Sequence, residues 1–174
     1  PEIVLDGSGL TTGDGVAIAS SGNVVSGLNV RSFPGSGVAI TGGGQNTIDA
    51  CYLGTDPTGT SAAGNQVGVS LSNSNRNVLG SGGAAGRNVI SGNAWYGIRV
   101  DEGSENEIRH NYIGVDASGS SALGNAWDGI LIYGASRNTI GVPSAAGELN
   151  GNVISGNGWN GVRINLTWAQ TPDS

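Results

Sequence analysis

Short segments that alternate hydrophobic and variable residues recur along this chain at a nearly constant distance. Each begins with a glycine, and the segments that start at Gly37, Gly68, Gly97, Gly129 and Gly161 are 31, 29, 32 and 32 residues apart. A shorter first unit begins at Gly15. Fixed periods of 20 to 50 residues are typical of stacked units that bury their apolar faces only against their neighbours. The pattern therefore predicts a repeat protein.

The alternation has a period of two, which predicts short strands and disfavours helical repeats. A second phrase, Asn-x-hydrophobic, follows each full segment, at Asn46, Asn77, Asn106 and Asn138. A third apolar segment contains Leu53, Ile113 or one of the two NVISGN runs at 88–93 and 152–157. Three strands per coil, each repeated one coil later in the same direction, stack as parallel sheets about 4.8 Å apart, and parallel crossovers are right-handed. We predict an all-β fold, a right-handed parallel β-helix of about six coils.

The same pattern predicts which side chains point inward. We expect columns of apolar side chains that include Ile98, Ile108, Ile113, Ile130, Ile140 and Ile154. We also expect the asparagines of the second phrase to bond to one another along the axis, as Asn side chains do in cross-β stacks. Residues 52–65 return 60 residues later as 112–125, and the coils between carry loops at 81–87 and 142–151. These loops are expected to project along one edge.

A single elongated domain over 1–174 is the simplest division of the chain. We expect a lead-in at 1–14, coils at 15–165 and a tail at 166–174 that leaves the repeat. The chain begins with Pro1 in the middle of the pattern, which suggests a piece of a longer protein.

Composition narrows the possible partners. The net charge is −6, and the seven basic residues are dispersed arginines. No basic stripe results, so nucleic acid and anionic membrane surfaces are disfavoured. No apolar run approaches the roughly 20 residues of a membrane-spanning helix. The single cysteine, Cys51, cannot form an intrachain disulfide or a CxxC site, and we expect it at a corner, in the place that Asn111 takes two coils later.

The phrases NVISGN, N-x-I-x-x-N-Y-I-G and G-[VI]-x-[IV], with the D-x-[ST]-G-[ST] loop, resemble the β-helix repeats of the pectate-lyase-like superfamily. More narrowly, they are similar to Asn/Gly-rich repeats of large secreted or surface-attached bacterial proteins. The resemblance covers roughly 13–165 and implies the fold and an extracellular or cell-surface location. It does not imply one activity, because the superfamily includes polysaccharide lyases, hydrolases, epimerases, phage tailspikes and non-catalytic stalks.

The acidic residues favour structure over catalysis. Glycosidases need two carboxyl groups that flank the scissile bond, whereas no carboxylate is expected directly above another here. The densest acidic group comprises Asp101, Glu102, Glu105 and Glu107, beside Arg99, Arg109 and the lone His110. A solvated corner with local ion pairs is favoured over a catalytic or metal cleft, and a packed or surface imidazole over a catalytic one.

Asp56 and Asp116 occupy equivalent places in the two matched loops and invite a calcium hypothesis. Both begin Asp-x-Thr/Ser-Gly turns, in which the carboxylate accepts hydrogen bonds from its own backbone. Turn formation is therefore favoured, and we predict no metal, no cofactor and no catalytic residue within the chain.

The most suggestive functional feature is aromatic. Trp95, Trp127 and Trp159 each stand two residues before a segment glycine, 32 residues apart. We expect them to stack at one outer corner, where a linear glycan along the axis could touch more than one ring. The polar contacts around them would come from Tyr96, Arg99, Asp128, Asn160 and Arg163. The alternative is that the indoles only shield the corner from water.

The sequence thus favours a non-catalytic, extracellular scaffold or adhesion segment with glycan contact along the Trp corner. One alternative is a polysaccharide lyase or hydrolase with catalytic residues partly outside this chain. Another is a purely structural spacer that assembles end to end.

Overall fold

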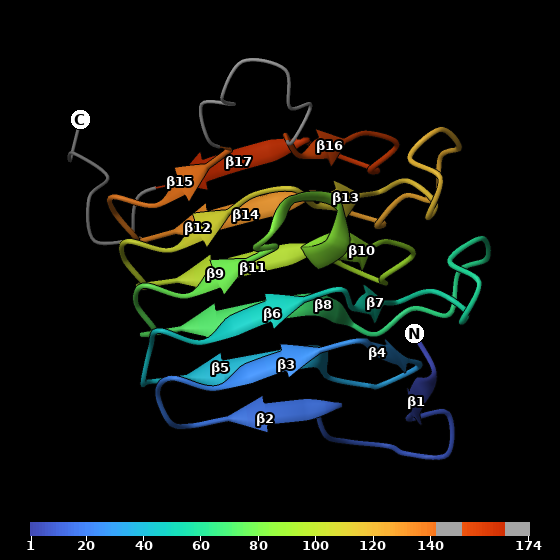
Figure 1. Ribbon diagram of the computed structural model, residues 1–174, viewed down its shortest axis with the longest axis horizontal. Coiled ribbons are helices and arrows are strands. Elements are labelled where there is room, and N and C mark those ends of the chain that lie inside the picture. Colours follow the sequence, from blue (N-terminus) through green and yellow to red (C-terminus); the bar gives the residue numbers. More distant parts are fainter. Residues whose placement is uncertain (142–150, 166–174) are drawn as a thin grey trace, which may run out of the picture.

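The computed structural model describes residues 1–141 and 151–165, and these form a parallel β-helix (Figure 1). We name its three sheets A, B and C. Sheet A contains β1 (Ile3–Asp6), β4 (Leu28–Arg31), β7 (Tyr52–Leu53), β10 (Val89–Ile90), β13 (Tyr112–Ile113) and β16 (Val153–Ile154). Sheet B contains β2 (Val16–Ile18), β5 (Ser36–Thr41), β8 (Val67–Ser72), β11 (Ile98–Asp101), β14 (Ile130–Tyr133) and β17 (Val162–Asn165). Sheet C contains β3 (Val24–Ser26), β6 (Thr47–Asp49), β9 (Val78–Leu79), β12 (Glu107–Ile108) and β15 (Thr139–Ile140).

Each coil adds one strand to each sheet, which confirms the predicted right-handed β-helix of about six coils. Ile98 pairs in parallel with Val69 of the coil before it and with Ile130 of the coil after it. The pairing begins earlier than expected, because β1 lies within the predicted lead-in and pairs with β4 along its whole length. The tail at 166–174 and most of the loop at 142–151 lie outside the described residues.

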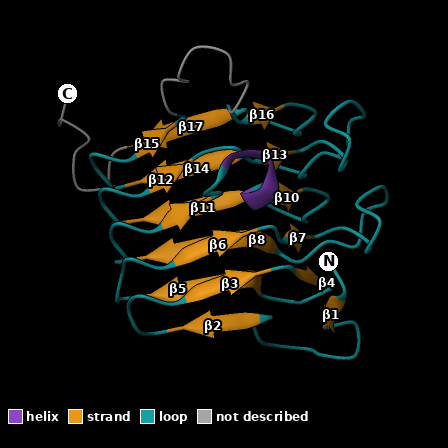
Figure 2. Ribbon diagram, viewed as in Figure 1, coloured by secondary structure: helices purple, strands orange, loops and turns teal. Residues whose placement is uncertain are grey.

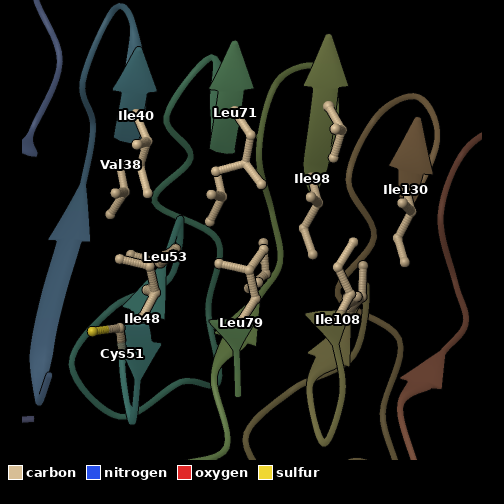
Figure 3. Close-up of a cluster of buried hydrophobic side chains, with 14 of the residues drawn as sticks. Val38, Ile40, Ile48, Cys51, Leu53, Leu71, Leu79, Ile98, Ile108 and Ile130 are labelled. Atoms are coloured by element: carbon tan, nitrogen blue, oxygen red, sulfur yellow. The ribbon is translucent and has the colours of Figure 1, made fainter. Parts of the chain in front are cut away.

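The core is a set of apolar columns between the three sheets, as the alternation predicts. Figure 3 shows Ile98 and Ile130 pointing from neighbouring strands of sheet B toward Ile108 of sheet C. Ile98, Ile108, Ile113 and Ile130 have no exposed surface, and Ile140 and Ile154 pack partly buried against the same cluster.

Close stacking of the coils requires the segment glycines Gly37, Gly68, Gly97 and Gly129. A Cβ added to Gly129 would lie 2.7 Å from both the Asn157 amide nitrogen and the Gly161 carbonyl oxygen of the next coil. Any larger residue at this position would push the two coils apart.

Buried asparagines form three ladders that run along the axis. The predicted ladder joins Asn46, Asn77, Asn106 and Asn138 through amide hydrogen bonds of 2.9–3.0 Å. The pattern did not predict the other two, which join Asn88 to Asn111 and Asn152, and Asn65 to Asn93, Asn125 and Asn157. Cys51 occupies the second of these ladders at its N-terminal end, where its backbone N–H donates to the Asn88 amide oxygen.

The loops do not share one edge, which corrects the sequence prediction. The matched loops at 54–65 and 114–125 connect sheet A to sheet B, as the projecting turns after β7 and β13 in Figure 1 illustrate. The loop that contains the 3-10 helix η1 (Gly83–Gly86) instead connects β9 of sheet C to β10 of sheet A, and it appears as the helix in Figure 2. The two kinds of loop follow different strands of the coil and therefore emerge at different corners. Within the described residues, no helix is long and apolar enough to cross a membrane.

Candidate functional site: the Trp corner and the outer hollow

The three tryptophans form a stacked column, which we call the Trp column. Trp95 and Trp127 lie with ring centroids 5.2 Å apart and planes 5° from parallel, and Trp127 and Trp159 lie 5.4 Å and 10° apart. Backbone hydrogen bonds hold this stack in register, because Trp127 N–H donates to the Trp95 carbonyl and Trp159 N–H to the Trp127 carbonyl. Gln66 fills the same place one coil before Trp95.

The stacking determines which ring surfaces a ligand could reach. Both faces of Trp127 are covered by its neighbours, and Tyr96 packs against it edge to face with centroids 5.2 Å apart. Trp159, at the C-terminal end of the column, is 61% exposed, whereas Trp95 and Trp127 are half-buried. A glycan along the axis would therefore meet ring edges at the middle of the column, and the accessible ring is Trp159.

Asp128 is a fully buried carboxylate beside the column. It forms an ion pair with Arg163, with 2.7 Å between Oδ2 and the guanidinium nitrogen. Its other oxygen accepts hydrogen bonds from the backbone and side-chain amides of Asn160, at 3.0 and 2.7 Å. Each Asp128 oxygen thus has a close partner, and the effect of the carboxylate is to fix Arg163 and Asn160 in place.

Next to the Trp column, the outer face of sheet B carries an open hollow of about 410 Å³, which we call the outer hollow. It is lined by Tyr96, Arg99, Leu131, Tyr133, Trp159, Arg163 and Asn165. Arg99, Leu131 and Arg163 share one register position on β11, β14 and β17, so they form a column on the outer face. Leu131 and Tyr96 are only 5% and 8% exposed, and they form an apolar cluster with Val67 outside the main core.

Of the eight residues proposed from the sequence, the structure brings Tyr96, Arg99, Trp159 and Arg163 together around the outer hollow. Trp95 and Trp127 support Trp159 from beneath. Asp128 holds Arg163 through an ion pair and accepts two hydrogen bonds from Asn160. Sequence reasoning missed Leu131, Tyr133 and Asn165 as lining residues. The signal was present, because the period of two places all three on the outer face of their strands.

The acidic residues near this face are engaged in ion pairs. Asp101 pairs with Arg99 at 2.7 Å and Glu107 with Arg109 at 2.9 Å. Glu105 lies between Arg76 and Arg137 of the neighbouring coils, at 2.7 and 3.1 Å, and the hydrogen bond from Arg76 lowers the pKa of its carboxyl. His110 is packed at 8% exposure. In the described ranges, no three His, Cys, Asp or Glu residues form a group that could hold a metal ion.

Asp56 and Asp116 form turns, as their sequence context predicts. Asp56 Oδ1 accepts hydrogen bonds from the backbone N–H groups of Thr60 and Ser61, at 2.9 and 3.0 Å. The hydrogen bond from the Thr58 hydroxyl, followed by those backbone bonds, lowers the pKa of Asp56. Asp116 makes the equivalent bonds to Ser118, Ser120 and Ser121, and its pKa is lowered for the same reasons.

Comparison with known proteins assigns no relative: no protein-family model matches the chain, and neither a curated protein nor a solved structure matches it.

Proposed function

We propose that this chain is a non-catalytic, extracellular segment of β-helix that acts as a rigid scaffold or adhesion surface and contacts a glycan at the Trp corner. The observation that carries the proposal is the outer hollow, where Trp159 and two tyrosines surround an open space that two arginines border. Flat aromatic rings suit the apolar faces of sugars, and fixed polar groups beside them give orientation. The resemblance of the repeats to those of the pectate-lyase-like superfamily, and of secreted bacterial proteins in particular, supports the location.

The state of the carboxylates supports a binding role over hydrolysis. A glycosidase needs one carboxyl group as an acid and a second as a base or nucleophile. The two carboxylates nearest the outer hollow, Asp101 and Asp128, are each paired with an arginine at 2.7 Å. These two carboxylates therefore already serve to hold Arg99 and Arg163.

The ladders and the stacked column support a rigid surface. Three asparagine ladders and parallel pairing on every coil tie the outer face of sheet B to the rest of the solenoid. A preorganised surface binds a ligand without first losing the freedom of its own side chains. Contact on an open face is nevertheless small, so we expect a dissociation constant on the order of 0.1 to 1 mM, or roughly 4 to 5.5 kcal/mol of binding free energy.

A glycan-array screen followed by titration of two variants tests the proposal. Trp159→Ala removes the exposed ring and should abolish measurable binding while leaving the melting temperature close to that of the wild type. Trp127→Ala is the matched control within the same column. Because both faces of Trp127 are packed, its loss should lower stability by about 2 kcal/mol.

Two results would contradict the proposal. One is the absence of binding by any oligosaccharide at millimolar concentration. The other is glycan binding that Trp159→Ala leaves unchanged. New reducing ends or ultraviolet-absorbing unsaturated products from a polysaccharide would show instead that the chain is catalytic.

A further inference from the structure

We propose that the outer hollow takes an uncharged, hydroxyl-rich sugar unit in preference to an acidic one. This inference rests on the proposed function, because it names the class of glycan that the same face would bind. It depends on how charge is distributed among the side chains that line the hollow and the side chains that touch them.

Each arginine of the outer hollow already has a carboxylate partner. Arg99 pairs with Asp101 and Arg163 pairs with Asp128, both at 2.7 Å. Two positive and two negative groups give the face no net charge. An acidic sugar would have to compete with Asp101 and Asp128 for the same guanidinium groups, so its charge would bring little gain.

The hydrogen-bonding groups that remain suit hydroxyls. A guanidinium has five N–H donors, and a carboxylate uses at most two of them in a fork. Arg99 and Arg163 are 39% and 28% exposed, so part of each guanidinium side chain reaches the open space. Asn165 adds an amide that can both donate and accept. Sugar hydroxyls likewise donate and accept, which matches this mixture better than a carboxylate does.

The Tyr133 hydroxyl independently indicates that the ligand carries hydroxyl groups. Tyr133 lines the hollow, and its hydroxyl is closed off from solvent without a hydrogen-bond partner among the described residues. An unpaired buried hydroxyl is unfavourable. A ligand hydroxyl that enters beside it, with a small shift of the covering side chains, would supply the missing partner.

The floor and the size of the hollow fit a sugar ring. Leu131 forms the floor between the two arginines, and Tyr96, Tyr133 and Trp159 stand around it. The axial C–H groups of a hexose would pack against the Trp159 ring, which is 61% exposed. The volume of about 410 Å³ lies within the roughly 300–1,000 Å³ of small-molecule sites.

The test titrates the protein with linear hexaoses of neutral sugars (cellohexaose, mannohexaose and laminarihexaose) and with oligogalacturonate, following the Trp159 indole N–H signal by NMR. We expect a neutral hexaose to bind with an affinity that does not change between 20 and 300 mM salt. Arg99→Ala should weaken that binding at least fivefold. Arg76→Ala, which removes an exposed arginine of another ion pair, is the matched control and should have no effect.

Asp101→Asn provides a second variant that preserves shape. It releases Arg99 and gives the face one net positive charge, so it should strengthen oligogalacturonate binding at least fivefold, and added salt should reverse the gain. Circular dichroism of each variant verifies that it folds.

The outcomes separate this inference from the proposed function. If the wild type prefers oligogalacturonate, with salt-dependent affinity, the inference is overturned and the proposed function stands. The same holds if a neutral hexaose binds and Arg99→Ala leaves its affinity unchanged. If no glycan of either class binds, both are overturned.

Discussion

At the scale of single residues, stability depends on amide side chains that bond from coil to coil. An asparagine in a ladder uses its Nδ2 group twice, once to the amide oxygen of the next coil and once to a backbone carbonyl of the coil before. These groups are buried, and a buried amide without partners is costly. Each ladder therefore specifies the axial register of its corner as well as stabilising it.

Cys51 is the one described member of its ladder that lacks an amide. Asn88, Asn111 and Asn152 donate to the carbonyls of Ile48, Leu79 and Ile108 at 2.8–2.9 Å. The Cys51 sulfur lies 3.8 Å from the equivalent carbonyl of Val25, and burial raises the pKa of the thiol. The place is thus shaped for an asparagine and is filled by a weaker donor.

We predict that Cys51→Asn stabilises the protein by about 1 kcal/mol, because the new amide would donate to the Val25 carbonyl and to the Asn88 amide oxygen. For a chain of this length, the melting temperature should rise by about 3 °C. Urea denaturation measures the change, and Cys51→Ala, which restores no donor, should be neutral or destabilising. A Cys51→Asn protein less stable than Cys51→Ala would show that this corner does not accept the ladder geometry.

At the scale of elements, the Asp56 turn has a testable dependence on pH. Its pKa is lowered in the folded state, so the stabilisation that it provides is complete above the unfolded value of about 3.9. That stabilisation is lost as the pH falls through the lower, folded pKa. The backbone N–H signals of Thr60 and Ser61 should therefore titrate by NMR with a midpoint below the ordinary pKa of aspartate.

The two matched loops give this experiment an internal control. Asp56→Asn should remove the titration of the Thr60 and Ser61 signals and leave that of Ser120 and Ser121, beside Asp116, unchanged. A midpoint at pH 5 or above, or a titration that persists in Asp56→Asn, would mean that another group controls the loop.

The sequence predicted the elements better than the places where they meet. The period of two identified the inward columns, because alternation depends only on local backbone geometry. The prediction that all the loops share one edge was wrong. The spacing of the repeats shows how many coils there are, but it does not show which strand of a coil precedes an inserted loop. β1 was missed because it precedes Gly15, the first segment glycine, from which the coils were counted.

The candidate site was predictable in part for the same reason. The spacing of 32 residues gave the Trp column, but it could not show that stacking covers the faces of Trp127. It also could not show that outward Leu131 and Tyr96 are buried by their neighbours. Both facts depend on the rotamers of long side chains across three coils, which a single sequence does not reveal.

At the scale of the whole molecule, the solenoid is held together by contacts between neighbouring coils. The strand order of each sheet contains only steps of one coil. Such a structure is nearly one-dimensional, and its stability is close to a sum over coils and the interfaces between them. The 60-residue double period adds a further feature, because the loop within residues 52–65 returns two coils later within residues 112–125.

We predict that the chain tolerates a tandem duplication of residues 52–111. At the junction, Asn111 would precede the second copy of Tyr52, just as Cys51 precedes the first copy. Asn111 and Cys51 occupy the same buried corner, so the junction fits the existing coil. The duplicated matched loop would lie two coils above the original, as the loop of Asp116 does now. Small-angle scattering should show a molecule longer by about 10 Å, from two strand spacings.

The duplication should also unfold cooperatively, with a urea dependence steeper than that of the parent because more surface becomes exposed. One contact would be lost, since Ala117 N–H donates to the Gly59 carbonyl at 2.9 Å and the second copy would place Pro57, which has no N–H, at that position. Pro57→Ala in the second copy should restore the contact and raise stability by up to about 1 kcal/mol. If the longer chain aggregates or melts in two separate transitions, its stability is not a sum over similar neighbouring coils. The loops or the ends of the solenoid would then contribute stability that the internal coils do not.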